Sequence, residues 1–257
     1  MHDYKNDKFD IILQGGQSNA EGCGVGPAEY EYRPDENILY MTNTERDGVG
    51  RDTKISYEGF DIDVANERVW DGHKVNEFAL SFAECYRKKL LRQDRKILIL
   101  RTAVGGTGWS DGRWGMKDDL YLNMMQMTKT ALSLNPANEL KAFLWHQGET
   151  DAGAGEKHYN NLLALVKSVR ETYNCPGLPF IAGDFVNEWK QKNLQLCEPT
   201  IQAIRSVCRD LGGAFVETSD LKSNNQEHGN GDDIHFSRNA LNILGVRYFE
   251  AYEKIIN

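Results

Sequence analysis

The chain has 257 residues, of which 40% are hydrophobic and 26% are charged. This composition is typical of one large globular domain with a substantial core, or of at most two small ones. The formal net charge of −8 argues against nucleic acid or an anionic membrane surface as the main partner, because both require a basic surface, and a neutral ligand fits better. No apolar run reaches the length of about 18 residues that a membrane-spanning helix needs.

The N-terminus and the cysteines indicate a cytoplasmic protein. The first residues, MHDYKNDKFD, are polar and contain no apolar segment of the kind found in a secretory signal. The five cysteines are odd in number, widely spaced and without a CxxC pair: Cys23, Cys85, Cys175, Cys197 and Cys208. We expect them to be reduced thiols rather than a disulfide framework or a zinc site.

The first predicted element is a strand over residues 9–14, FDIILQ, which ends at two glycines shortly before Ser18. Residues 24–75 follow as a long segment rich in Gly, Asp, Asn and Arg, with little periodicity. Insertions of this length in a compact domain tend to be functional loops, so we expect this one to shape the pocket. The next segment, NEFALSFAECYRKKLLRQ, predicts a helix, because its apolar residues recur every four positions.

Strands and helices alternate along the rest of the chain. Continuous apolar runs, typical of strands buried on both faces, predict four more strands at residues 96–101, 141–146, 179–183 and 213–217. Helical patterns occur at 119–134, 156–173, 193–211 and 238–255. This order implies right-handed crossovers and a parallel sheet covered by helices on both sides. We therefore predict a single three-layer α/β/α sandwich domain over residues 1–257, with a five-stranded parallel sheet.

Polar or glycine-rich segments follow four of the five predicted strands. These segments are residues 15–19, 102–114, 147–151 and 230–237. In open parallel sheets, ligands bind beyond the carboxyl ends of the strands. We therefore expect the four segments to meet at one site.

Ser18 permits two interpretations. Ser, Asn and Gly are common in turns and N-caps, so GGQSNAEG could be only a turn. The pattern Gly16-x-Ser18-x-Ala20 is close to the G-x-S-x-G of a nucleophile elbow but lacks the second glycine. Because a nucleophilic serine needs a base within hydrogen-bond reach, the choice depends on a histidine.

His235 is the strongest candidate base among the six histidines. It lies in GDDIHFS, just before the last predicted helix, with Asp232 three residues earlier. This spacing allows a carboxylate to fix the tautomer and orientation of an imidazole. We expect the side chain of the adjacent Asp233 to point elsewhere. A loop of acidic residues with a capping role is the alternative.

Two further segments could bind a developing negative charge. A glycine of VGGTGW, residues 104–109, could present a bare backbone N–H to an oxyanion, and Gln147 could supply a side-chain N–H. The first segment lacks the Gly-Lys-Ser/Thr ending of a phosphate loop, which argues against nucleotide binding. A flexible loop and simple hydrogen bonding of a strand end are the respective alternatives.

Metal ligands and sugar-stacking rings are the remaining possibilities at these strand ends. The spacing of His146, Glu149 and Asp151 is not a recognised ligand set, so we expect no metal. Three tryptophans lie in or beside the same loops: Trp109, Trp114 and Trp145. Such tryptophans usually belong to the core, but an exposed ring can stack on the C–H face of a sugar.

Four ordered motifs resemble the SGNH-hydrolase superfamily: GQSNAEG (16–22), GGTGW (105–109), WHQGETD (145–151) and DDIHFS (232–237). They are most similar to the branch that contains carbohydrate esterase family six acetylxylan esterases and sialate O-acetylesterase domains. The likeness extends through LPFIAGDF (178–185) and LGVRYFEAY (244–252), and so covers nearly the whole chain. It implies a flavodoxin-like sheet with Ser18 as nucleophile, His235 as base and Asp232 as the acid that orients the base.

The same resemblance implies roles for further residues. Oxyanion donors are expected from the Ser18 backbone, from a glycine of the Gly105–Gly106 pair and from the Gln147 side chain. Glu149 either ties the loops together or competes with Asp232 as the acid. Three more candidates for supporting the site or binding substrate are Gln17, Asn19 and Trp109.

The sequence therefore predicts a serine esterase that removes O-acetyl groups from carbohydrates through an acyl-enzyme, with neither metal nor organic cofactor. The expected substrate is a small-molecule or oligosaccharide acetyl ester. Three alternatives remain open. They are a short-chain acyl ester hydrolase with non-sugar substrates, a non-catalytic carbohydrate-binding protein, and a metal-dependent hydrolase that uses His146, Glu149, Asp151 and His235.

Overall fold

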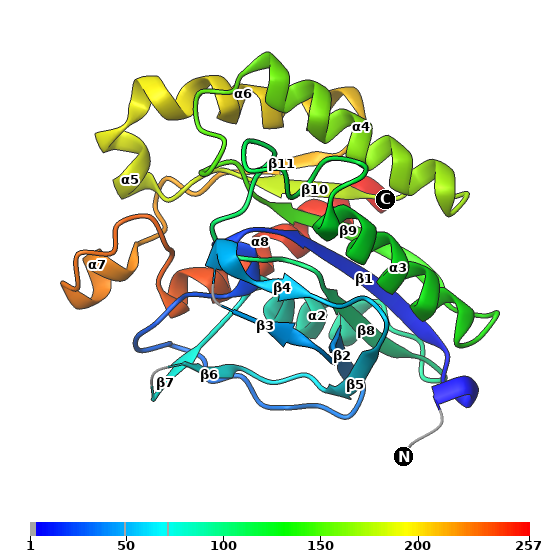
Figure 1. The fold of residues 1–257 in the computed structure, drawn as a ribbon. Helices are drawn as coiled ribbons and strands as arrows, with labels where there is room; N and C mark the ends of the chain where they lie inside the picture. Colours follow the sequence, from blue (N-terminus) through cyan, green and yellow to red (C-terminus); the bar gives the residue numbers. More distant parts are fainter. Residues whose placement is uncertain (1–3, 49, 71) are drawn as a thin grey trace.

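The computed structural model describes residues 4–48, 50–70 and 72–257. His2 of the polar N-terminus, and Val49 and Asp71 of the long segment at 24–75, lie outside the described residues. A seven-stranded sheet with the order β11-β10-β9-β1-β8-β2-β5 runs through the molecule (Figure 1). Its strands are β1 (Phe9–Gly16), β2 (Ile38–Asn43), β5 (Phe60–Val64), β8 (Lys96–Arg101), β9 (Glu139–His146), β10 (Phe180–Gly183) and β11 (Ala214–Val216).

All strand pairs in this sheet are parallel except β2 with β5. The five predicted strands are all present, and the predicted α/β fold with a mostly parallel sheet is confirmed. The predicted strand number is wrong, because residues 24–75 add β2 and the antiparallel β5. β2 offers only the short apolar run Ile38–Met41, and β5 is largely exposed. β5 therefore lacks the continuous apolar run of a strand buried on both faces, and the apolar run of β2 stands alone in a segment that is otherwise polar and aperiodic.

The central strand β1 is buried at all eight positions. It pairs with β8 on one side and β9 on the other. Ile11 and Leu13 belong to the core on one face of the sheet, and Ile12 belongs to the core on the opposite face. Because both faces are covered, the middle of the strand is a continuous apolar run, Ile11–Leu13, rather than an alternation of apolar and polar residues.

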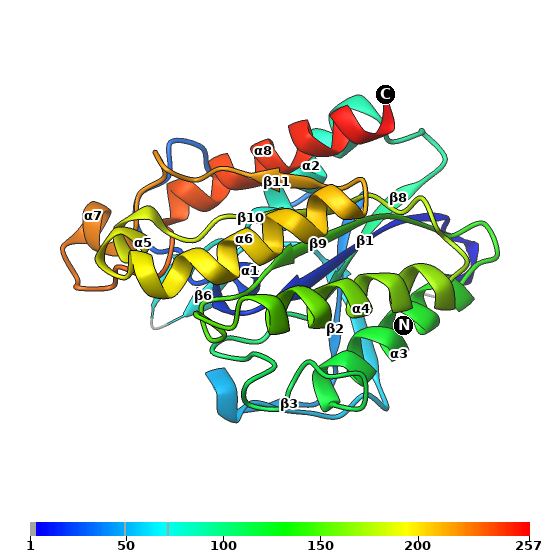
Figure 2. The same ribbon diagram turned by 90° about the horizontal axis from the view of Figure 1, so that it is seen from above.

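Helices cover both faces of the sheet (Figure 2). One face is covered by α2 (Phe78–Lys89) and α8 (Arg238–Ile256), and the other by α3 (Asp119–Ser133), α4 (Glu156–Thr172) and α6 (Leu194–Asp210). The last four of these begin and end within one residue of the predicted bounds. Among the helices of the described residues, none combines the length and apolarity that crossing a bilayer requires.

The remaining elements are short. Two small hairpins, β3 (Arg46–Asp47) with β4 (Lys54–Ile55) and β6 (Arg68–Trp70) with β7 (His73–Val75), lie in the long segment. The other short elements are η1 (Tyr4–Asn6), η2 (Gly50–Asp52), α1 (Ser18–Glu21), α5 (Asn187–Lys192) and α7 (Asn224–His228). The long segment is thus strand and turn built around the edge of the sheet, not one open loop.

Candidate active site

A glycine at the end of β1 allows the chain to turn sharply into α1. Gly16 has a φ of 133°, and a Cβ at this position would collide with the carbonyl of His146 on the neighbouring strand. Only glycine accepts both conditions without strain. Gln17 N–H then donates to His146 O at 2.9 Å, which fixes the turn against β9. Ser18 follows as the first residue of α1, at the carboxyl edge of the sheet.

Ser18, His235 and Asp232 form a continuous row of hydrogen bonds. His235 Nε2 lies 2.9 Å from Ser18 Oγ, and His235 Nδ1 lies 2.9 and 3.0 Å from the two carboxylate oxygens of Asp232. The backbone N–H of His235 also donates to Asp232 Oδ1 at 3.3 Å. Ser18 is 7% exposed, so the hydroxyl is close to solvent yet held in place. A carboxylate, an imidazole and a hydroxyl in this order are the groups that activate a serine nucleophile.

Asn224 supports Asp232 in a way that the sequence analysis did not foresee. Asn224 Nδ2 donates to Asp232 Oδ2 at 2.8 Å and to Cys23 O at 3.0 Å. Burial opposes the charge of Asp232, but hydrogen bonds from His235 and Asn224 outweigh it and lower the pKa of the carboxyl. The carboxylate is therefore ionised at neutral pH. Asn224 opens α7, a helix too short for hydrophobic periodicity to reveal.

Asn19 ties the serine segment to the histidine segment. Its Nδ2 donates to Ile234 O at 3.1 Å, and its Oδ1 accepts the Phe236 N–H at 3.0 Å. These two partners flank His235 in the chain. The same Nδ2 donates to Glu149 Oε1 at 2.8 Å. Asn19 thus fixes the backbone on both sides of His235 relative to the adjacent Ser18.

Glu149 is buried behind Asn19 and does not hydrogen-bond to His235. It is 6% exposed, and its Oε2 has no hydrogen-bond partner within the described ranges. Burial raises the pKa of this carboxyl. The nearest ring nitrogen is Nε2 of the buried His146, 3.9 Å from Glu149 Oε1. Of the two carboxyls that the sequence analysis left in competition, Asp232 is therefore the one bonded to His235.

The candidate oxyanion donors differ in their present partners. Among the described residues, no group accepts a hydrogen bond from Ser18 N–H. Gly105 lies against Ser18, because a Cβ on it would come within 3.5 Å of Ser18 Cβ, but its N–H donates to Glu21 Oε2 at 2.6 Å. Gly106 has a φ of 68° and lies beside Arg51 of the long segment.

Gln147 is engaged elsewhere in this structure. Its Nε2 donates to Asp151 Oδ2 at 2.7 Å and to Thr107 O at 3.3 Å. Both amide hydrogens therefore already have acceptors in the loops after β8 and β9. Its Oε1 has no hydrogen-bond partner in the described part of the chain.

Glu21, which the sequence analysis did not single out, occupies the Gly105 N–H. Its carboxylate also accepts a hydrogen bond from Arg46 and lies 3.7 Å from Arg68 Nη1. Both arginines come from the two hairpins of the long segment. This segment therefore contacts the loop beside the nucleophile through an ion-pair network. The sequence separation between Glu21 and its partners left no local pattern from which to infer the contact.

The remaining predicted residues surround the row of hydrogen bonds. Gln17 Oε1 accepts the N–H groups of Gly148 and Thr150 at 3.4 and 3.1 Å, which joins the loop after β1 to the loop after β9. Trp114 and Trp145 are buried, whereas Trp109 is partly exposed.

The residues of the metal hypothesis have other partners. Asp151 accepts the N–H groups of Trp109 and Ser110 at 3.0 and 2.8 Å, besides that of Gln147. His146 Nδ1 lies 3.0 Å from the Tyr248 hydroxyl. Across residues 4–48, 50–70 and 72–257, no three His, Cys, Asp or Glu side chains converge to hold a metal ion.

Comparison with known proteins gives a consistent result. Residues 8–254 match the family described as carbohydrate esterase, sialic acid-specific acetylesterase. The chain is 28% identical, over 264 aligned positions, to the probable carbohydrate esterase At4g34215 of Arabidopsis thaliana, covering 94% of this chain and 89% of that protein. It is also 28% identical, over 226 positions, to the probable 9-O-acetyl-N-acetylneuraminic acid deacetylase of Escherichia coli K12, covering 72% and 69%.

The fold has a close counterpart among solved structures. The crystal structure of NanS superimposes with a TM-score of 0.77 over 98% of both chains, at 18% identity. At this identity the likeness concerns the fold alone.

Proposed function

The chain belongs to the sialic acid-specific acetylesterase family of carbohydrate esterases, and on this premise we propose that it deacetylates sugars through Ser18 and an acyl-enzyme. As a member of this family it is a carboxylic ester hydrolase. In the proposed first step, His235 Nε2 takes the Ser18 proton as Oγ attacks the acetyl carbonyl. The sugar alcohol leaves with that proton, and water, activated by the same imidazole, then releases acetate.

Asp232 serves His235 in this mechanism. Its hydrogen bonds at 2.9 and 3.0 Å to Nδ1 keep that nitrogen protonated, so that Nε2 presents its lone pair to Ser18. The carboxylate also stabilises the imidazolium that forms in the transition state. The lowered pKa of Asp232 supports this role, since the group must be charged at the working pH.

We assign the oxyanion to backbone N–H groups. Ser18 N–H has no acceptor among the described residues, so it is available to donate to the oxyanion as the first donor. Gly105 N–H is the second donor, once the Glu21 carboxylate turns from it toward Arg46 and Arg68. Gln147 becomes a third donor only if its amide leaves Asp151, so Gln147→Ala measures whether it takes part. Removal of one true oxyanion donor costs on the order of 10²–10³ in kcat.

The observation that carries the proposal is the unbroken row from Asp232 through His235 to Ser18. The test is hydrolysis of p-nitrophenyl acetate by Ser18→Ala, with Ser133→Ala as control, because Ser133 is exposed at the end of α3. We expect Ser18→Ala to lose at least about 10³-fold in kcat and to lose labelling by a fluorophosphonate. Full activity in Ser18→Ala would falsify the assignment of the nucleophile.

The substrate class rests on the relatives rather than on the triad. A probable sialate deacetylase and a probable carbohydrate esterase are both similar to this chain, so we propose acetylated sugars over non-sugar esters. Acetate release should be measured for acetylated sialic acids, acetylated xylo-oligosaccharides and simple acetyl esters. Equal kcat/KM for all three would identify a general short-chain esterase instead.

A further inference from the structure

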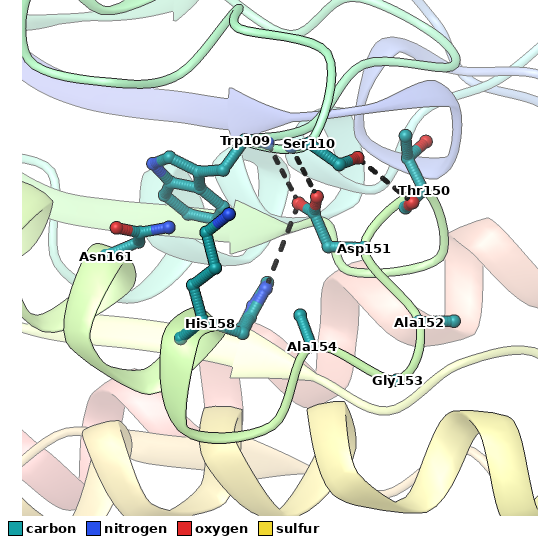
Figure 3. A pocket seen from close by; sticks show the side chains of 10 residues that line it. Trp109, Ser110, Thr150, Asp151, Ala152, Gly153, Ala154, His158 and Asn161 are labelled. Carbon is teal, nitrogen blue, oxygen red and sulfur yellow. Dashed lines mark hydrogen bonds and ion pairs between the residues drawn. The ribbon is translucent and has the colours of Figure 1, made fainter.

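A cavity of about 260 Å³ opens beside the candidate active site. It lies between the loop after β8, which carries Trp109 and Ser110, and the start of α4, which carries Lys157 and His158 (Figure 3). The mechanism proposed above uses none of these side chains. The volume lies just below the range of about 300–1,000 Å³ typical of small-molecule pockets, which suits a ligand of one ring.

Trp109 forms an aromatic wall of the cavity. The ring is partly exposed, and its position is fixed by an edge-on contact with His158, with ring centroids 5.0 Å apart at 88°. A second contact joins it to Trp145, with centroids 5.7 Å apart. Its backbone N–H is also held by Asp151. A rigid, partly exposed indole presents an apolar surface at little conformational cost, and the C–H face of a pyranose can pack on it.

His158 supplies unsatisfied polar groups to the same cavity. It is 1% exposed, and within the described ranges neither ring nitrogen has a hydrogen-bond partner. Asp151 Oδ2 lies 3.9 Å from Nδ1, beyond hydrogen-bond distance. Burial lowers the pKa of His158 to about 4, against the opposing pull of Asp151, so the ring is neutral and offers one donor and one acceptor. Buried polar groups are normally paired, and a ligand hydroxyl in the cavity would pair these.

The rim of the cavity adds a cation and an amide. Lys157 is exposed, Asn161 is half-buried, and neither side chain bonds to another group in the described part of the chain. Both lie on the first turns of α4 beside Trp109 (Figure 3 labels Asn161). An ammonium and an amide at the mouth of an aromatic pocket are suited to hydroxyl and carboxylate groups of a sugar.

Two connections join the lining of the cavity to the segment that carries the nucleophile. Thr150, which lines the cavity, donates its N–H to Gln17 Oε1 at 3.1 Å, and Gln17 precedes Ser18. The loop that begins at Gly105, against Ser18, continues to Trp109 and Ser110 at the cavity. The cavity therefore lies on the same two loops that pack against the Ser18 segment.

We propose that this cavity is a carbohydrate subsite, which packs one pyranose ring of the substrate on Trp109 and pairs its hydroxyls with His158 and Asn161. The inference rests on the proposed function, because it assumes that the molecule at Ser18 is a sugar ester. Lys157 at the rim favours a ring that carries a carboxylate, as a sialic acid does, over a neutral ring such as xylose.

The first experiment measures binding without catalysis. The Ser18→Ala protein is titrated with N-acetylneuraminic acid and with xylobiose, by calorimetry and by tryptophan fluorescence. We expect Trp109→Ala in this background to weaken the binding at least about 10-fold, and Trp109→Phe to restore most of it. Binding of the acidic sugar in preference to the neutral sugar is the expected result, whereas binding of the neutral sugar alone would overturn the preference assigned to Lys157. Absence of binding by both sugars overturns the subsite.

The second experiment separates the subsite from the active site. In the Ser18-containing protein, Trp109→Ala should lower kcat/KM at least about 10-fold more for an acetylated sugar than for p-nitrophenyl acetate, mainly through KM. An equal loss for both substrates would mean that Trp109 only supports the catalytic loop. Lys157→Ala should weaken the binding of N-acetylneuraminic acid but not that of xylobiose. Lys167 is exposed on the same helix, and Lys167→Ala should change the binding of neither sugar.

These outcomes are distinguishable from failure of the proposed function. If Ser18→Ala kept full activity toward p-nitrophenyl acetate, the nucleophile would be wrong while the binding data still tested the subsite. If activity depended on Ser18 but no sugar bound, the esterase would stand and the subsite would fall. Thermal melting of each variant checks that the fold is retained.

Discussion

Replacement of Asp232 by asparagine should separate the role of this carboxylate from that of Glu149. Both residues were candidates for the acid that serves His235, but only Asp232 hydrogen-bonds to His235 Nδ1. The Asp232→Asn substitution keeps the size of the side chain and removes its charge. Glu149→Gln is the matched comparison, since it removes a buried carboxyl and keeps the Oε1 that accepts from Asn19.

The distance between the two groups sets the size of the expected effect. At 2.9 Å and an effective dielectric constant of about 20, an imidazolium and a carboxylate attract each other by about 5–6 kcal/mol. This corresponds to about 10⁴ in rate. The Asp232 side chain is 29% exposed, so solvent screening reduces the attraction. We therefore expect Asp232→Asn to lose about 10³-fold in kcat, and Glu149→Gln to stay within a factor of about 3.

The assay is steady-state hydrolysis of p-nitrophenyl acetate, with KM reported separately. Because the imidazolium forms only in the transition state, the loss in Asp232→Asn should be in kcat, with KM nearly unchanged. A larger loss of kcat in Glu149→Gln than in Asp232→Asn would refute the reasoning and make Glu149 the acid. Melting temperatures of both variants show whether an altered fold contributes.

Three further outcomes are expected. Asn19→Ala removes the hydrogen bonds to the backbone on both sides of His235. We expect kcat to fall about 10–100-fold and the free energy of unfolding, measured in urea, to fall by about 2–3 kcal/mol. An unchanged kcat would show that Asn19 does not position His235. Burial lowers the pKa of His146 to about 3. Below about pH 6.5 the unfolded chain therefore binds a proton that the folded chain does not, and the free energy of unfolding decreases as the pH falls. This contribution approaches about 1.4 kcal/mol per pH unit; His146→Asn should reduce the slope between pH 6.5 and 5, and an equal slope in both proteins would contradict the burial of a neutral ring. Gly16→Ala should yield little folded protein, because a Cβ there meets the His146 backbone at positive φ; a soluble variant with the parent's melting temperature would contradict the geometry of the turn.

The sequence predicts the parts of the fold that are buried on both faces. β1 and β8 are continuous apolar runs because helices cover the sheet on either side, and such runs need no knowledge of tertiary contacts. β2 and β5 were not predicted for the opposite reason. Their place in the sheet depends on pairing with β8 and with each other, and neither strand is apolar over its full length.

The part of the candidate site that lies at the carboxyl ends of the parallel strands was predictable from the sequence. Ser18 follows β1 directly, and the topology of a parallel sheet brings it toward the other strand ends. The Asp-x-x-His spacing and the family resemblance favoured Asp232 as the acid, but Glu149 remained a competitor, because spacing alone does not give the direction of a side chain. The occupation of Gly105 N–H by Glu21 is likewise set by packing of the long segment, through Arg46 and Arg68.

The row of hydrogen bonds joins residues from the two ends of the chain. Ser18 follows the first strand of the sheet, whereas Asp232 and His235 precede its last helix, so the reacting pair is separated by 217 residues. Contacts between segments so far apart in the chain must repay the entropy of loop closure, so we expect this row to form late, once α8 has docked on α2. Esterase activity during refolding should therefore appear with the final cooperative step and lag behind recovery of helical circular dichroism. Recovery of esterase activity would then report that folding is complete.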